Sequence, residues 1–116
     1  MIPIEKLIEF TGFTKDELSK PNRKDCYVVA RACVYKHIVD SGCSFKYAGE
    51  VFDQDHATVM NGIKKLGYIM ETNTPLLRKQ ADLFYLNMKA YIYETNIKIN
   101  DSGFYPFINL EALEQC

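Results

Sequence analysis

The stretch from Arg23 to Asp40 contains neither proline nor glycine, the two residues that most often interrupt a helix. Its apolar residues recur at intervals of three or four, which places them on one face of a helix: Tyr27, Ala30, Val34 and Ile38. Ser41-Gly42 follows, and glycine is the residue that most often ends a helix. We therefore expect one long helix here, with a buried face against which other elements pack.

Shorter helical segments flank this one. Apolar residues repeat at helical spacing from Ile2 to Phe10, and Gly12 ends that segment. Thr14 to Glu17 has the capping-box pattern that starts a short helix. Thr74-Pro75 pairs a capping threonine with a proline at the first helical position, and the helix it starts is expected to run from about Pro75 to Ile97. No internal repeat or strand pairing is visible, so the sequence predicts an all-α fold.

Between residues 44 and 70 the pattern is a short helix, a tight polar turn and a longer helix. Ser44 can cap the first helix, which is expected to turn these side chains inward: Phe45, Ala48, Val51 and Phe52. Asp53-Gln54 forms the turn. Asp55 opens the second helix, whose apolar stripe is Val59, Ile63, Leu66 and Met70. This order, set on a longer supporting helix, is typical of a helix-turn-helix.

The overall charge does not indicate nucleic-acid binding. The 116 residues fit one compact domain, and their formal net charge is -1. Basic residues are nevertheless concentrated between positions 20 and 36, where only Asp25 opposes them: Lys20, Arg23, Lys24, Arg31 and Lys36. A local stripe of this kind can bind phosphates, although a run of charge is more often a solvated face.

Other classes of function have little support in the sequence. No Cys-x-x-Cys pair occurs among Cys26, Cys33, Cys43 and Cys116, and with only two histidines a metal site is not expected. His37 and His56 are accompanied by no nucleophile elbow or phosphate loop, so we expect neither an enzyme nor a cofactor. The sequence shows no signal peptide and no apolar run near the roughly 20 residues of a membrane span. We expect reduced thiols, a cytoplasmic location and no membrane partner.

The start of the second helix, Asp55-His56-Ala57-Thr58, carries side chains suited to reading bases. Aspartate can accept a hydrogen bond from the exocyclic amine of cytosine or adenine, histidine can contact base-edge acceptors, and threonine offers a hydroxyl and a methyl. Spacing alone favours a simpler interpretation, in which Asp55 caps the helix and His56 is an exposed first-turn residue.

Several motifs occur in a fixed order along the first 70 residues. Arg31 lies in the long helix, Ala48-Gly49-Glu50-Val51-Phe52 closes the serine-led helix, and Asp55-His56-Ala57-Thr58-Val59 precedes Ile63-Lys64-Lys65-Leu66. Over about residues 4–70 this order resembles the C-terminal DNA-binding domain (domain IV) of the bacterial replication initiator DnaA. The resemblance implies a Trp-repressor-like helix-turn-helix bundle in residues 1–72, an extra long closing helix in 73–97 and a tail in 98–116.

The same resemblance implies which residues touch DNA. The turn at residues 55–58 would enter the major groove and an arginine before the long helix the minor groove, so the expected base contacts are Arg23, Asp55, His56, Ala57 and Thr58. The arginine within that helix would hold a phosphate. Position and charge add further candidates, and the expected backbone contacts are Lys24, Arg31, Lys36, Ser44, Lys64 and Lys65.

The implied function is sequence-specific binding of double-stranded DNA, in replication-origin binding and initiation or in regulation. Without a phosphate loop, the chain would be a stand-alone regulator or accessory replication factor that lacks an ATPase domain, such as a mobile element or prophage can carry. Asp53-Gln54 replaces the family's Gly-Gly-Arg, and Ala57 its first threonine, which leaves an alternative open: a protein-interaction module of the same fold that has lost DNA affinity. A homodimer or a protein partner could use the 75–97 helix or the tail.

Overall fold

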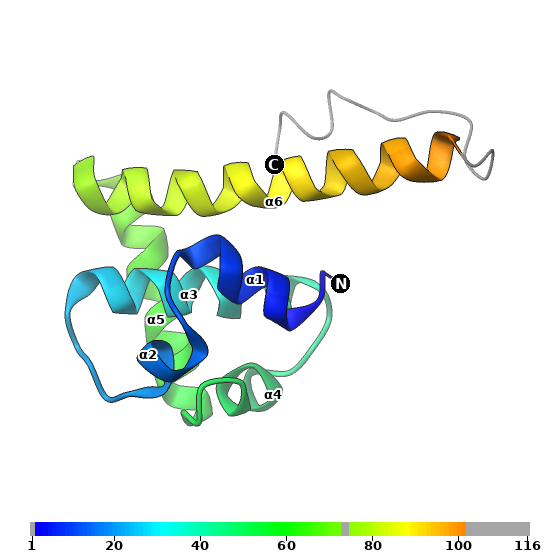
Figure 1. Cartoon of the computed structure of the whole chain (residues 1–116). Coiled ribbons are helices and arrows are strands. Elements are labelled where there is room, and N and C mark those ends of the chain that lie inside the picture. The colour runs from blue at the N-terminus through cyan, green and yellow to red at the C-terminus, as the bar shows by residue number, and fades with distance from the viewer. Residues whose placement is uncertain (1, 73–74, 102–116) are drawn as a thin grey trace. The chain divides into compact units, whose positions relative to one another are not determined.

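The computed structural model describes residues 2–72 and 75–101, with the backbone alone at 96–101. The described residues form six helices and no strand, so the predicted all-α fold is confirmed. The helices are α1 (Ile4–Thr11), α2 (Lys15–Ser19), α3 (Asp25–Asp40), α4 (Phe45–Glu50), α5 (His56–Glu71) and α6 (Pro75–Asp101) (Figure 1). Two compact units, Met1–Phe84 and Tyr85–Cys116, meet inside α6, whereas the sequence suggested a boundary after residue 72.

The residues expected to start and stop helices occupy those positions. Gly12 ends α1 at a φ of 81°, in the left-handed region that glycine adopts without strain. Thr14 and Glu17 make both bonds of the capping box, at 3.0 and 3.2 Å. The side chains of Ser44 and Asp55 each accept a backbone N–H at the starts of α4 and α5. The predicted Thr74 cap lies outside the described residues.

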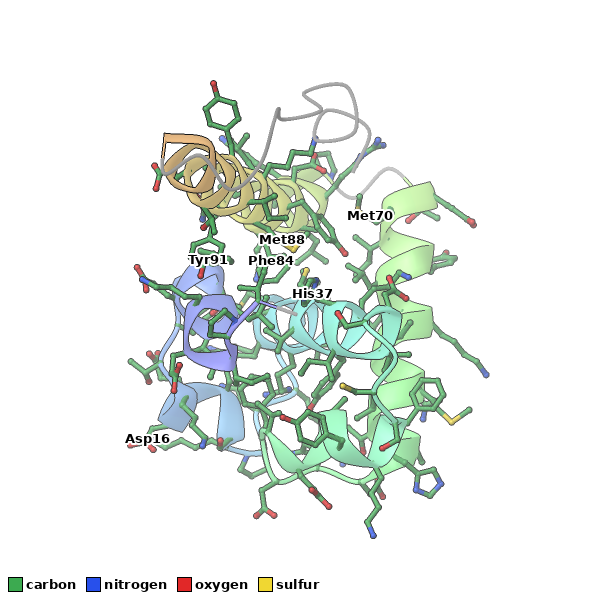
Figure 2. All side chains as sticks on the ribbon, turned by 90° about the vertical axis from the view of Figure 1, so that its right-hand side faces the viewer. Asp16, His37, Met70, Phe84, Met88 and Tyr91 are labelled. Carbon is green, nitrogen blue, oxygen red and sulfur yellow. The ribbon has the colours of Figure 1, made fainter. Side chains whose placement is uncertain are left out.

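The core of the first unit is built around α3. Its central residues, from Val29 to Tyr35, are all buried, and Ile38 is buried one turn later. α3 packs against α1, α2, α4 and, most extensively, α5. In Figure 2, α1 and α2 lie on one side of α3 and α5 on the other. This covering from two sides buries more of α3 than the single face that the sequence predicts.

Residues 75–84 of α6 belong to the same unit. Ala81 and Phe84 are buried, and the ring of Phe84 lies edge-on to that of Phe10 with centroids 6.2 Å apart. The side-chain amide of Gln80 donates to the backbone carbonyl of Cys26 at 2.6 Å. These turns therefore pack as part of the first unit. α6 as a whole runs to Asp101, past the predicted end, so the predicted tail of residues 98–116 begins inside the helix and then leaves the described residues.

Some of the predicted inward positions were wrong. Phe45 is 38% exposed, and Ile63 and Met70 are only half-buried. Within α5, Val59 and Leu66 are buried as predicted, and Ile69 is buried in place of Ile63 and Met70. The reason is Gly62: a Cβ added there would lie 3.8 Å from the Cβ of Ala32, so the helices approach each other at a residue that carries no apolar side chain. The face of α5 that contacts α3 is therefore displaced from the apolar stripe that the sequence predicts.

The turn between α4 and α5 depends on two backbone positions. Asp53 has a φ of 56°, in the left-handed region where Gly, Asn and Asp are the usual residues. Gly49 is buried beneath the turn, and its carbonyl accepts the N–H of Gln54 at 2.8 Å. A methyl group on Gly49 would overlap the carbonyl oxygen of Gln54 and lie 3.2 Å from that of Asp55. The turn therefore closes only over a residue without a Cβ.

We expect Gly49→Ala to destabilise the first unit by about 1–3 kcal/mol, because the turn must move away from the added methyl. Gly67→Ala is the matched control, since no atom lies within 4 Å of the Cβ added there; it should be neutral or stabilising by up to about 1 kcal/mol through helix propensity. Urea unfolding followed by circular dichroism measures both variants. Equal midpoints for the two would contradict the close approach at Gly49.

Candidate nucleic-acid interface

The first turn of α5 exposes all four residues of the predicted reading segment: Asp55, His56, Ala57 and Thr58. One carboxylate oxygen of Asp55 accepts the backbone N–H of Thr58 at 2.8 Å, which makes Asp55 the N-cap. Hydrogen bonds from the side chain and the backbone of Thr58 lower the pKa of Asp55, so this group is a carboxylate at neutral pH. A carboxylate has lone pairs beyond those the cap uses, so capping does not prevent it from accepting a base amine.

Arg31 holds the segment between α2 and α3. It is only 8% exposed, and its Nη1 donates to the carbonyls of Leu18 and Lys20 at 3.2 and 3.4 Å, while Nη2 donates to that of Asn22 at 2.5 Å. A buried guanidinium needs such partners, because an unpaired charge is costly inside a protein. The first role of Arg31 is therefore structural, and its expected contact with a DNA phosphate stays a prediction. The segment that it holds carries Arg23, the predicted minor-groove residue.

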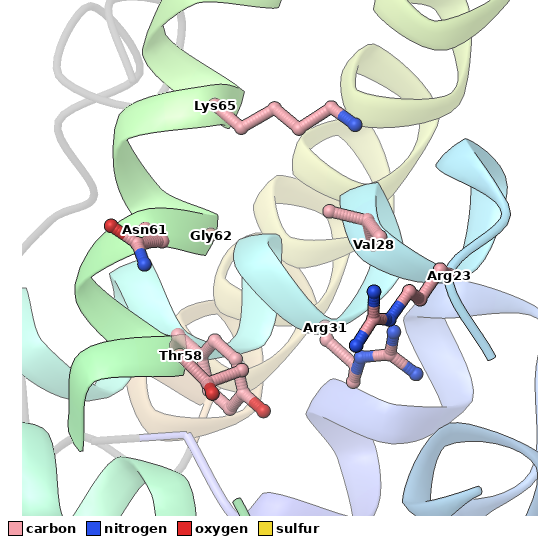
Figure 3. A pocket seen from close by; sticks show the side chains of 8 residues that line it. Arg23, Val28, Arg31, Thr58, Asn61, Gly62 and Lys65 are labelled. Atoms are coloured by element: carbon pink, nitrogen blue, oxygen red, sulfur yellow. The ribbon is translucent and has the colours of Figure 1, made fainter. Parts of the chain in front are cut away.

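A pocket of about 310 Å³ opens between the start of α3 and the facing turns of α5 (Figure 3). We call it the basic pocket, and its lining residues are Arg23, Val28, Arg31, Tyr35, Thr58, Asn61, Gly62 and Lys65. In Figure 3 the two arginines reach it from one side, and α5 supplies Thr58, Asn61 and Lys65 from the other. The pocket brings Arg23 and Thr58 together, although the sequence assigned them to different grooves.

The predicted lysine contacts are only partly brought together. Lys65 lines the basic pocket and donates to Asp25 at 2.6 Å. Lys24 is exposed at the start of α3, beside Arg23 in the chain. Lys36 pairs with Asp40 at 2.8 Å and does not line the pocket, although its neighbour Tyr35 does. The structure therefore separates Lys36 from the pocket.

Ser44 and Lys64 lie on exposed positions outside the pocket. The hydroxyl oxygen of Ser44 accepts the N–H of Tyr47 at 3.0 Å, which leaves its proton for donation to an anion. Lys64 is exposed and directly precedes Lys65, yet it does not line the pocket. This neighbouring pair provides a matched comparison of two lysines on one helix.

Sequence reasoning missed Tyr35, which is buried among apolar residues of α3 and also lines the basic pocket. Alone it is an ordinary core aromatic, and its ring lies 5.8 Å from that of Phe52, centroid to centroid. The available signal was its position one turn after Arg31, which puts a hydroxyl and a cation on one helical face. This position forms part of a pocket only because Gly62 of α5 lies opposite the ring of Tyr35.

Cys33 and His37 are packing residues of α3. Burial raises the pKa of Cys33 to about 12, so its thiol keeps its proton. Burial also lowers the pKa of His37, whose Nε2 has no hydrogen-bond partner among the described residues. Within residues 2–72 and 75–101, no group of three His, Cys, Asp or Glu side chains could hold a metal ion. No helix in the described ranges is long and apolar enough to cross a membrane.

No protein-family model matches this chain, and no solved structure is significantly similar to it. The resemblance to the initiator domain therefore rests on sequence motifs alone. The structure adds geometry to those motifs: an exposed first turn of α5, a turn closed over Gly49, and a pocket lined by both Arg23 and Thr58.

Proposed function

We propose that this protein binds double-stranded DNA sequence-specifically, with the first turn of α5 in the major groove and Arg23 in the neighbouring minor groove. The observation that carries the proposal is that Arg23 and Thr58 line one pocket although they come from different elements. In a duplex a single sugar-phosphate strand separates neighbouring grooves, so a protein that reads both must hold its two reading elements close together. The family resemblance then suggests an origin-binding accessory factor or regulator.

The exposed side chains of the reading turn supply complementary chemistry. Asp55 accepts from an exocyclic amine, His56 contacts a base-edge acceptor, and Ala57 and Thr58 offer methyl groups to thymine. Lys24, Lys64 and Ser44 are exposed and can contact phosphates beside them. A net charge of -1 is compatible with this proposal, because phosphate contacts depend on local charge near the strand.

A selection of bound duplexes from a random pool tests the proposal. The expected result is one enriched sequence, bound with an affinity that falls steeply with salt as counterions are released. The enriched duplex then serves for all affinity measurements. If no duplex binds even at low ionic strength, the protein does not read DNA.

With the selected duplex, Arg23→Ala and His56→Ala should each weaken binding by roughly 10- to 100-fold, since a base contact contributes about 1–3 kcal/mol of discrimination. Both side chains are exposed, so the thermal midpoint should stay unchanged. Arg78→Ala, at an exposed arginine of α6 that lines no part of the basic pocket, is the control for Arg23 and should bind normally. Fluorescence anisotropy measures the affinities, and unaltered binding in both test variants would refute these assignments.

A protein-interaction module is the second candidate, and exposed apolar residues on α4 and α5 favour it. Phe45 and Tyr47 of α4 are 38% and 43% exposed, and Met60 and Tyr68 of α5 are 39% and 67% exposed. Such side chains are common at protein interfaces. Absence of duplex binding at low salt, with the fold intact, would favour this candidate. The homodimer expected from the long helix or the tail stays a prediction, which sedimentation velocity tests.

A further inference from the structure

The basic pocket gathers three positive charges around one space. Arg23, Arg31 and Lys65 all line it, and among its described lining residues none is acidic. Asp25, outside the lining, pairs with Lys65 at 2.6 Å, which leaves the two arginines as the excess charge. Like charges held around a common space repel one another, and an anion between them removes that repulsion. The charge pattern therefore points to an anionic occupant.

Tyr35 provides an independent sign of a missing partner. Its side chain is 1% exposed and lines the same pocket, and in the described part of the chain its hydroxyl has no hydrogen-bond partner. A buried polar group without a partner is rare, because it has lost water and gained nothing in return. Burial raises the pKa of Tyr35 to about 12, which the charge of Arg31 only partly offsets, so the hydroxyl keeps its proton and can donate. The expected partner is therefore an acceptor.

We propose that the basic pocket binds a phosphate group. The lining offers donors of several kinds: guanidinium and ammonium N–H groups, the hydroxyls of Tyr35 and Thr58, and the amide of Asn61. A phosphate, with more acceptor oxygens than a carboxylate, can use more of these donors at once. Three of the donors of Arg31 are taken by backbone carbonyls, so this residue contributes mainly its charge and its remaining N–H groups.

Two sources can supply this phosphate. One is the backbone of a bound duplex: if Arg23 and Thr58 read neighbouring grooves, the strand between those grooves passes over the pocket that they share. For this source the inference rests on the proposed function. The other source is a free phosphate or phosphate monoester, which requires no DNA. The test therefore has one arm for each source.

The first arm is an NMR titration of the full chain with inorganic phosphate, against sodium chloride and sodium acetate at equal ionic strength and pH. Phosphate should cause saturable chemical-shift changes in the signals of Val28, Thr58 and Gly62, and acetate should cause much smaller changes. Lys65→Gln should weaken the phosphate affinity about tenfold, as expected for the loss of a charge-assisted hydrogen bond. Lys64→Gln, next to it on α5 and outside the pocket, should leave the affinity unchanged.

Two further variants separate binding from structure. Asp25→Asn removes the carboxylate that competes for Lys65, so it should tighten phosphate binding, whereas Lys65→Gln weakens it. If this ion pair had a purely structural role, both variants would change the phosphate affinity in the same direction. Tyr35→Phe keeps the ring and removes the hydroxyl, so it should weaken phosphate binding about tenfold without lowering the thermal midpoint. Unchanged phosphate affinity in Tyr35→Phe and Lys65→Gln would overturn a phosphate site at this pocket for the free anion.

The second arm measures duplex affinity against salt for Lys65→Gln and for Lys79→Gln, a change at an exposed lysine of α6 that does not line the pocket. A loss specific to Lys65→Gln, with a salt slope lower by about one unit, supports a backbone phosphate in the pocket. Saturable phosphate binding without any duplex binding supports a free-phosphate site and counts only against the proposed DNA function. If phosphate behaves like chloride or acetate and the two lysine variants bind duplex equally, the inference is overturned for both sources.

Discussion

Replacing Val59 by aspartate should unfold the first unit. Val59 is fully buried on the first turn of α5, where that helix packs against α3 and α4. A carboxylate there would be cut off from water, and protonating it to avoid the charge also costs free energy. The loss should be about 4 kcal/mol or more, a large part of the roughly 5–15 kcal/mol that stabilises a typical domain. Far-UV circular dichroism and urea unfolding measure the outcome.

Met60→Asp is the matched control for this substitution. Met60 is the next residue of the same helix and is 39% exposed, so the same new charge stays in water. This variant should keep its helical signal, with a change in stability within about 1 kcal/mol. If Val59→Asp and Met60→Asp unfold at the same urea concentration, the buried face of α5 has been misassigned.

Arg31→Met should cost about 2–4 kcal/mol of folding free energy. The substitution keeps a long apolar side chain but removes the donors that hold the carbonyls of Leu18, Lys20 and Asn22. Hydrogen bonds to a charged group contribute about 1.5–3 kcal/mol each, and water can replace those to the two part-buried carbonyls. The segment before α3 should also loosen, and this is the segment that carries Arg23. Urea unfolding gives the first effect, and amide hydrogen exchange of residues 20–24 gives the second.

Arg78→Met controls for the loss of an arginine at an exposed position, and it should leave both measurements unchanged. Arg31→Lys should recover only part of the lost stability, because an ammonium cannot span the three carbonyls as a planar guanidinium does. If amide hydrogens of residues 20–24 exchange as slowly in Arg31→Met as in the parent protein, other contacts hold the segment.

Helix starts and stops could be predicted from the sequence because they depend on neighbouring residues. Gly12, the Thr14–Glu17 capping box, Ser44 and Asp55 occupy the expected positions, since each satisfies backbone groups only a few residues away. The all-α class follows from the same local signals. The exposure of the Asp55–Thr58 turn was likewise expected, because a polar first turn has no apolar side chain to bury.

Contacts between helices could not be predicted in the same way. Periodicity placed Ile63 in the apolar stripe of α5, but α5 approaches α3 at Gly62 and Ile63 is only half-buried. Phe45 was placed in the core, yet it is exposed on α4. Apolar periodicity measures which residues avoid water on average, whereas close packing depends on the shapes of both surfaces.

The sequence by itself determined the helices, their caps and the polar turn at the start of α5, because these depend on local hydrogen bonds and on the helical repeat. Only the tertiary structure decided the role of Arg31 and the setting of Tyr35. The sequence suggested only a phosphate contact for Arg31, whereas the structure shows that its donors hold carbonyls between α2 and α3. Tyr35 became part of a pocket because α5 approaches α3 at Gly62. Both outcomes depend on residues that are separated in the chain, and only the folded backbone brings them within reach.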